Sequence, residues 1–171
     1  MLFKQFKFKD LVPVAPAIAE FSTGQTMGQD ADRLAARFGV TRMEQDEFAL
    51  DSQKKAELAW ANGHFDSQIA PVTVKSRKGD VVLDRDEHMR PQTTLEGLAK
   101  LPGVFAEENG TVTPGNASGI TDGAAVLVLM SADEAERRGI TPLAEFLDSQ
   151  TAGTDPKRMG LGPVPATAQL F

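Results

Sequence analysis

Apolar residues recur with helical spacing early in the chain. Ala31, Leu34, Ala35 and Phe38 follow one another at i, i+3, i+4 and i+7, which is the pattern of a helix with one buried stripe. Asp30 precedes the stripe and Gly39 follows it, in the positions that favour an N-cap and a helix stop. The pattern therefore predicts a helix that Asp30 caps and that runs to about Phe38.

A second, longer helix is predicted to begin at Thr41. Thr41 and Glu44 have the spacing of a capping box, in which each side chain bonds the other residue's backbone N–H. Gly63 is placed to end this helix. A stripe of small residues along it would permit close packing of a neighbouring element: Ala49, Ser52, Ala56 and Ala59.

The middle of the chain predicts a hairpin followed by a short helix. Residues 68–74 and 80–83 have the apolar content of strands, and the turn between them carries Lys75, Arg77 and Lys78. Thr93 and Glu96 then form a second capping box, for a helix through Leu101.

The second half of the chain predicts a mixed α/β arrangement. Asn109-Gly110 is typical of a tight turn, and the length and composition of 124–130 predict a fully buried strand. Ser131 and Glu134 form a third capping box, for a helix that ends at Gly139. The remaining expectations, in order, are a strand over 142–147, a Gly- and Pro-rich loop over 153–165 and a helix from Ala166 to Phe171.

Composition narrows the class of protein. The chain has 171 residues, 18 Lys and Arg against 24 Asp and Glu, and a formal net charge of −6, which disfavours a general nucleic-acid-binding surface. It contains no cysteine, which excludes disulfides, cysteine zinc sites and a thiol nucleophile in this chain. Neither a signal peptide nor a transmembrane helix is predicted, so we expect a cytoplasmic location, or a mitochondrial one in a eukaryote.

The first residues leave two interpretations open. Phe6 and Phe8 alternate with lysines. This pattern fits an edge strand or packed arm, and it also fits a weak contact with a membrane surface.

The segment from Gly110 to Ala124 contains four glycines in fifteen residues and leads into the predicted buried strand. Glycines permit close backbone approach, while Asn116, Ser118 and Asp122 can bond either local backbone or a ligand. The residues alone leave a self-bonded turn and a ligand loop as equal alternatives. A phosphate loop is excluded because the segment lacks both G-x-G-x-x-G and a Gly-Lys-Ser/Thr ending.

Several motifs resemble those of the thiolase family, in family order. GTVTPGNASGITDGA is similar to the family's GTVTAGNASGINDGA, and MGQDADRL is similar to its MGxTAE. TRMEQDEFALDSQKKA and DEHMRPQTTLEGLAKLPGVF resemble two further segments, so the resemblance covers roughly residues 20–168. It implies an α/β fold, a partial thiolase-like fold in which a helix-rich loop domain precedes the closing strands and helix of an αβαβα core. The implied divisions are an arm over 1–20, the loop domain over 21–109, the end of the N-terminal domain over 110–162 and the start of the C-terminal domain over 163–171.

The resemblance also implies an activity. Thiolases cleave 3-ketoacyl-CoA with CoA, or condense two acyl-CoA molecules, through a cysteine nucleophile, a second cysteine and a histidine in Gly-His-Pro. This chain has no cysteine, and neither His64 nor His88 precedes proline. We therefore expect a fragment that does not catalyse alone, with no metal and no cofactor beyond CoA and acyl-CoA as substrates. The alternatives are a non-catalytic CoA-binding module and an interaction fragment that pairs with a partner holding the rest of the fold.

Five residues are implied to bind CoA. Ser118 matches a serine that meets pantetheine, Arg90 an arginine near the nucleotide, and Phe105 an aromatic near the adenine and pantetheine. Met27 and Met159 match methionines beside the acyl channel. Each also has a purely structural alternative, such as turn closure, solvated surface or core packing.

Other positions qualify that assignment. Pro114 replaces a common alanine and removes a backbone N–H from the loop, and Gly97 stands where some members have a CoA-contacting serine. The basic turn over 75–78 is expected to be solvated rather than a phosphate site, and both histidines are expected in exposed loops. The family assembles as homo-oligomers or in β-oxidation complexes, and the opening of this chain most resembles the thiolase subunit of such a complex.

Overall fold

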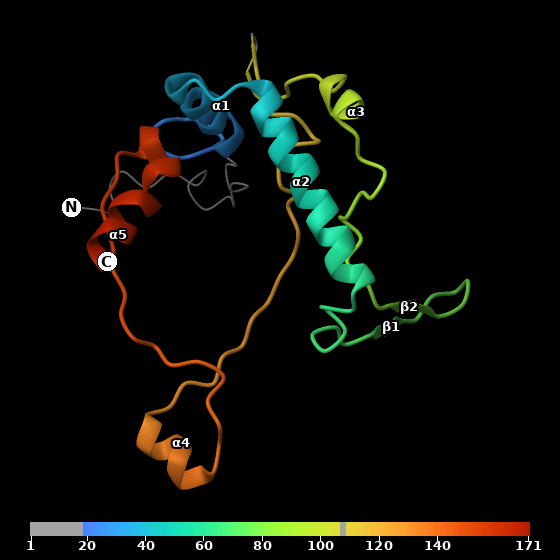
Figure 1. Ribbon diagram of the computed structural model, residues 1–171, viewed down its shortest axis with the longest axis vertical. Helices are drawn as coiled ribbons and strands as arrows, with labels where there is room; N and C mark the ends of the chain where they lie inside the picture. The colour runs from blue at the N-terminus through green and yellow to red at the C-terminus, as the bar shows by residue number, and fades with distance from the viewer. Residues whose placement is uncertain (1–18, 107–108) are drawn as a thin grey trace, which may run out of the picture.

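The computed structural model describes residues 19–106 and 109–171 (Figure 1). Its elements are α1 (Met27–Phe38), α2 (Arg42–Ala61), β1 (Val72–Val74), β2 (Val81–Leu83), α3 (Leu95–Ala99), α4 (Ala132–Arg138), the 3₁₀ helix η3 (Pro156–Leu161) and α5 (Pro163–Leu170). The interpretations of Phe6 and Phe8 concern residues outside the described ranges. None of the described helices combines the length and the apolar content that crossing a membrane requires.

Helix α1 begins earlier than the sequence pattern predicts. Thr26, not Asp30, is its N-cap: the Thr26 side chain accepts from the Gln29 backbone, and the Gln29 side chain accepts from Thr26 N at 3.0 Å. The predicted burial of the apolar stripe is also wrong, because Phe38 stays exposed while Asp30 and Asp32 are the buried residues of the helix. The described residues place little apolar surface over that stripe, and α1 instead packs against η3.

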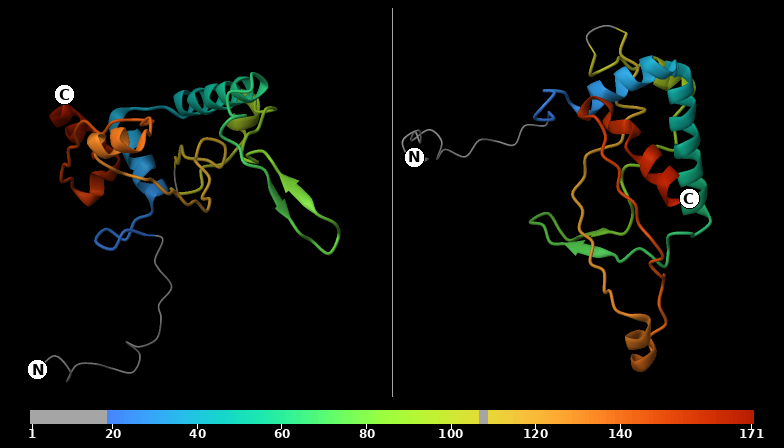
Figure 2. Two further views of the ribbon diagram at one scale, coloured as in Figure 1. Left: turned by 90° about the horizontal axis from the view of Figure 1, so that it is seen from below. Right: turned by 90° about the vertical axis from the view of Figure 1, so that its left-hand side faces the viewer.

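Helix α2 confirms its predicted capping box. Glu44 Oε2 accepts from Thr41 N at 2.7 Å, while Thr41 Oγ1 accepts from Glu44 N at 3.2 Å. Bonding to Thr41 lowers the pKa of Glu44. The helix ends at Ala61, just before Gly63. Figures 1 and 2 show α2 as the long element that separates α1 from the hairpin.

The predicted hairpin is confirmed, with strands shorter than expected. β1 and β2 pair antiparallel with Val72 opposite Leu83, and all six strand residues are exposed. At its base the Trp60 ring lies 5.2 Å from the Phe65 ring, and the Arg85 guanidinium lies 5.2 Å from the Trp60 ring. The Arg85 contact joins the chain just after β2 to the end of α2.

Helix α3 is capped by Thr94 rather than Thr93 and ends at Ala99 rather than Leu101. Thr94 Oγ1 accepts from Gly97 N at 3.1 Å, whereas the Thr93 hydroxyl donates to the Arg90 carbonyl at 2.6 Å. Two adjacent threonines compete for the cap, and the first is already engaged by the preceding turn.

The two strands predicted in the second half are not formed. Residues 124–130 have no strand structure, and Val126, Leu127, Val128 and Leu129 are 80% to 92% exposed. Residues 142–147 likewise lack strand structure and are exposed. Both appear in Figure 1 as extended segments leading to and from α4. A strand needs hydrogen-bonding neighbours, and the described residues provide none beside these segments.

Helix α4 keeps only half of its predicted capping box. Ser131 accepts from Glu134 N, but the Glu134 carboxylate pairs with Arg137 and Arg138 instead of reaching back. Bonds to those two arginines lower the pKa of Glu134.

The predicted loop over 153–165 is also wrong, since it holds η3 and the start of α5. Helix α5 begins at Pro163, three residues before the predicted start, because proline is tolerated in a first helical turn.

Candidate functional site

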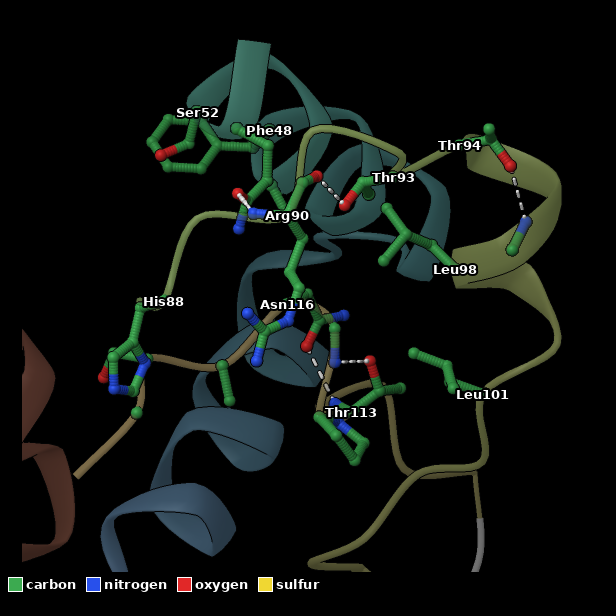
Figure 3. Close-up of a pocket in the computed structure, with 18 of the residues that line it drawn as sticks. Phe48, Ser52, His88, Arg90, Thr93, Thr94, Leu98, Leu101, Thr113 and Asn116 are labelled. Carbon is green, nitrogen blue, oxygen red and sulfur yellow. Dashed lines mark hydrogen bonds between the residues drawn. The ribbon is translucent and has the colours of Figure 1, made fainter. Parts of the chain in front are cut away.

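A cleft of about 1050 Å³ lies between α2, α3 and two loops. One loop holds residues 88–94 and the other holds 113–119; Figure 3 shows their side chains converging. Four residues of α2 and the segment from Leu101 to Phe105 complete the walls. The cleft therefore gathers segments that are far apart in the sequence.

Asn116 holds the 113–116 turn closed. Its Oδ1 accepts from Thr113 N at 2.8 Å (Figure 3). Its Nδ2 donates to the Thr111 carbonyl at 2.9 Å and to Asp46 Oδ1 at 3.0 Å. Thr113 is fully buried. One amide thus satisfies three backbone and side-chain groups and fixes the turn to α2.

The Asp46 carboxylate links this turn to α3 through an arginine. Asp46 is only 3% exposed, and its Oδ2 accepts from Arg42 Nε at 2.8 Å. Arg42 also donates to the carbonyls of Leu98 and Leu101, at 2.6 and 3.0 Å. A cation at the carboxyl end of α3 satisfies carbonyls that the short helix leaves free. The network Arg42–Asp46–Asn116 therefore joins three walls of the cleft.

Asp32 of α1 holds Thr111 and Val112, the residues that lead into the turn. Its Oδ1 accepts from Thr111 N, Thr111 Oγ1 and Val112 N, at 2.7, 3.0 and 2.9 Å. The other oxygen, Oδ2, is buried without a partner among the described residues. Asp32 thus connects α1 to the loop that carries Ser118 by hydrogen bonds.

Pro114 does not disrupt the loop. It occupies the second position of a turn in which Asn116 N donates to the Thr113 carbonyl at 3.3 Å, and proline is favoured there. Gly115 packs its backbone against α3, since a Cβ would overlap Leu98 and come within 2.6 Å of Leu101. The loop is thus shaped by close backbone approach as well as by hydrogen bonds.

Arg90 presents an unneutralised charge to the cleft. Its backbone N donates to Gln53 Oε1 of α2 at 2.7 Å, which holds the loop in place. Its guanidinium donates to the Glu87 carbonyl at 2.7 Å and forms no ion pair with a described carboxylate. In Figure 3 the side chain extends toward the turn that holds Asn116.

The structure brings three of the five predicted site residues together and separates two. Ser118, Arg90 and Phe105 line the cleft, while Met27 and Met159 line a second cavity of about 240 Å³ beside α1 and η3. The Phe105 ring packs on Gly28, where any Cβ would overlap it. Phe105 therefore lines the cleft and also contacts Gly28, the neighbour of Met27 in the sequence.

The histidines are exposed as predicted, but His88 also lines the cleft, which the sequence analysis missed. Its ring packs on Gly119, where a Cβ would lie 2.6 Å from the ring. The sequence signal that could have indicated this is its position two residues before Arg90, a predicted site residue. The basic residues of the 75–78 turn do not line the cleft. No cluster of three or more potential metal ligands occurs within residues 19–106 and 109–171.

Comparison with known proteins identifies similar chains. Residues 1–133 match the model of the family described as thiolase, N-terminal domain. The beta-ketothiolase BktB of Cupriavidus necator is 52% identical over 141 residues, which are 82% of this chain and 36% of that protein.

Two solved structures are similar in fold. The Bacillus anthracis acetyl-CoA acetyltransferase superposes with a TM-score of 0.83 at 45% identity, covering 89% of this chain and 38% of the other. Human mitochondrial 3-ketoacyl-CoA thiolase gives 0.82 at 42% identity, with the same coverage. The chain thus spans less than two fifths of the length of each.

Proposed function

The chain belongs to the thiolase family and has part of the thiolase fold, and on that premise we propose that it supplies CoA-binding residues of a thiolase-type acyltransferase. The proposed reaction is cleavage of 3-ketoacyl-CoA by CoA, or the reverse condensation of two acyl-CoA molecules. One observation carries the proposal: Ser118, Arg90 and Phe105, selected from three separate segments, line a single cleft.

The chemistry of that cleft suits CoA. Arg90 offers a guanidinium that no described carboxylate neutralises, which fits the phosphates at the nucleotide end. The Ser118 hydroxyl is exposed at the wall of the cleft and is available to an amide of pantetheine. Phe105 adds an aromatic face for the adenine or the pantetheine chain. Met27 and Met159, in the neighbouring cavity, would line the acyl channel.

We assign the thiolytic bond-making and bond-breaking steps to residues outside this chain. Thiolytic chemistry needs a thiolate nucleophile and an activating base, and the chain has no cysteine. The proposed role of this chain is therefore binding and positioning, in an assembly such as a β-oxidation complex in which another polypeptide holds the cysteine residues. The same lack of cysteine favours a second candidate, a CoA-binding module without catalysis.

CoA titration of the isotope-labelled chain, followed by NMR at two salt concentrations, tests the proposal. We expect weak binding, with a Kd of about 1 mM, because a chain that spans less than two fifths of its relatives would supply only part of the pocket. Amide shifts should map to Arg90 and Ser118, and affinity should fall with salt because exposed cations hold the phosphates.

Two variants and a control separate the roles. Arg90→Ala should weaken binding by about fivefold and flatten the salt dependence. Ser118→Ala should weaken binding without changing that slope. Arg77→Ala, on the hairpin turn outside the cleft, is the matched loss of charge and should change neither. Equal binding by the Arg90→Ala chain and the parent would overturn the CoA site.

A further inference from the structure

The second cavity has an unusual charge pattern for a site beside an anionic ligand. Glu20 and Asp30 line it together with Met27 and Met159, and no lysine or arginine of the described residues does. The other lining residues are small, polar or proline: Ala19, Thr23, Gln25, Thr26 and Pro156. The cavity therefore combines apolar methionine side chains with two carboxylates.

The two carboxylates differ in their bonding. Glu20 Oε2 accepts from Ser22 Oγ and from Thr23 N, both at 2.7 Å, and these bonds lower the pKa of Glu20 to about 2. Asp30 is only 7% exposed, yet its side chain has no hydrogen-bond or ion-pair partner among the described residues. The Asp30 oxygens are not among the fully buried atoms without a partner, so this carboxylate faces the cavity and can accept from a donor placed there.

The cavity lies next to the CoA cleft. Phe105 lines the cleft and packs its ring on Gly28, the residue between Met27 and Gln29 at the start of α1. Helix α1 packs against η3, and Figure 1 shows both on the opposite side of α2 from α3. A ligand that reached from the cleft to Met27 would have to pass Phe105.

We propose that Asp30 makes this cavity selective for the far end of the acyl group: it favours acyl chains that end in a hydrogen-bond donor such as a hydroxyl, and rejects chains that end in a carboxylate. The inference rests on the proposed function, since it takes the cavity as the acyl site. Its physical basis is separate from that of the cleft. A terminal hydroxyl donates to Asp30, whereas a terminal carboxylate adds a third negative charge to a cavity without a cation.

The test uses three thioesters of N-acetylcysteamine with the same four-carbon skeleton: butanoyl, 4-hydroxybutanoyl and succinyl. These probes lack the nucleotide, so their binding does not need the Arg90 cleft. The readout is the NMR shift of the Met27 and Met159 methyl groups in the full chain. Two carboxylates about 4 Å apart in water repel enough to weaken binding about fivefold. We therefore expect succinyl to bind at least fivefold more weakly than butanoyl, and 4-hydroxybutanoyl to bind more tightly.

Asp30→Asn keeps the shape and removes one of the two charges, so the ratio between succinyl and butanoyl should fall toward one, with Glu20 retaining part of the repulsion. Asp133→Asn, on exposed α4, should leave the ratio of the parent chain unchanged. Equal affinities of the three thioesters in the parent chain, or the absence of methyl shifts with all of them, would overturn the inference. Failure of the proposed function is seen separately, as the absence of CoA-induced shifts at Arg90 and Ser118.

Discussion

Removal of the Asn116 side chain should open the turn that carries Ser118. Asn116→Ala deletes three hydrogen bonds, to Thr113 N, to the Thr111 carbonyl and to Asp46 Oδ1. At about 1 kcal/mol each, their net loss is about 3 kcal/mol, which corresponds to about a 100-fold increase in the opening equilibrium. The Asp46 oxygen left without its donor adds to this cost, because that carboxylate is buried.

Amide hydrogen exchange measures this opening directly and does not require global two-state unfolding. The Thr113 amide and the Ala117 amide, which donates to the Thr113 carbonyl at 3.0 Å, should exchange about 100-fold faster in Asn116→Ala. Asn62→Ala is the matched control, since Asn62 is exposed at the end of α2 and its side chain bonds no described residue.

A second variant separates charge from shape. Asn116→Asp keeps the side-chain outline but sets a carboxylate where the amide now lies 3.0 Å from Asp46 Oδ1. Like charges at that distance should open the turn at pH 7, and protonation should close it partly at lower pH. Exchange rates within threefold of the parent in both variants would refute the view that Asn116 holds the turn.

Two further predictions concern α1 and its approach. Hydrogen bonds from Ser22 and Thr23 lower the folded-state pKa of Glu20 from its ordinary value of 4.5 to about 2, so this carboxylate stabilises the local turn above pH 4.5 and the stabilisation is lost as pH falls toward 2. Carboxyl NMR titration should show a midpoint near 2, and Ser22→Ala should raise it. Gly28→Ala should displace the Phe105 ring and weaken CoA binding, whereas Gly123→Ala, where a Cβ meets no atom within 4 Å, should leave binding unchanged in the same titration.

Local sequence signals predicted the start of a helix correctly where only one residue could serve as its N-cap. Thr41 and Glu44 satisfied each other as expected, because both partners lie within one turn. At α1 the signal was ambiguous: Thr26 followed by Gln29 has the same capping-box spacing, and it prevailed over Asp30. Asp46 is a different case. Its partner Asn116 lies 70 residues away, and no periodicity or spacing in the sequence indicates that contact.

The site residues divide in the same way. Composition and periodicity left the glycine-rich segment open between a turn and a ligand loop, and the structure contains the self-bonded turn. The juxtaposition of Arg90, Phe105 and Ser118 came from family resemblance, which carries long-range information that single-residue patterns lack. His88 and Asp30 belong to no predicted motif, and only the folded arrangement shows which cavity each one lines.

Helix α4 and its flanks show why the expected strands failed where the helix succeeded. Ser131 caps α4 and Glu134 pairs with Arg137, so the polar groups of this helix find partners within the helix and its cap. Residues 124–130 and 142–147 carry strand-like composition, but a strand is satisfied only by neighbouring strands, and the described residues supply none. The cleft, by contrast, is held by hydrogen bonds between residues far apart in the sequence. Asp32 accepts from Thr111, and Asp46 accepts from Asn116. The proposed CoA site therefore depends on contacts that this chain makes itself, which is why it can be tested on this chain.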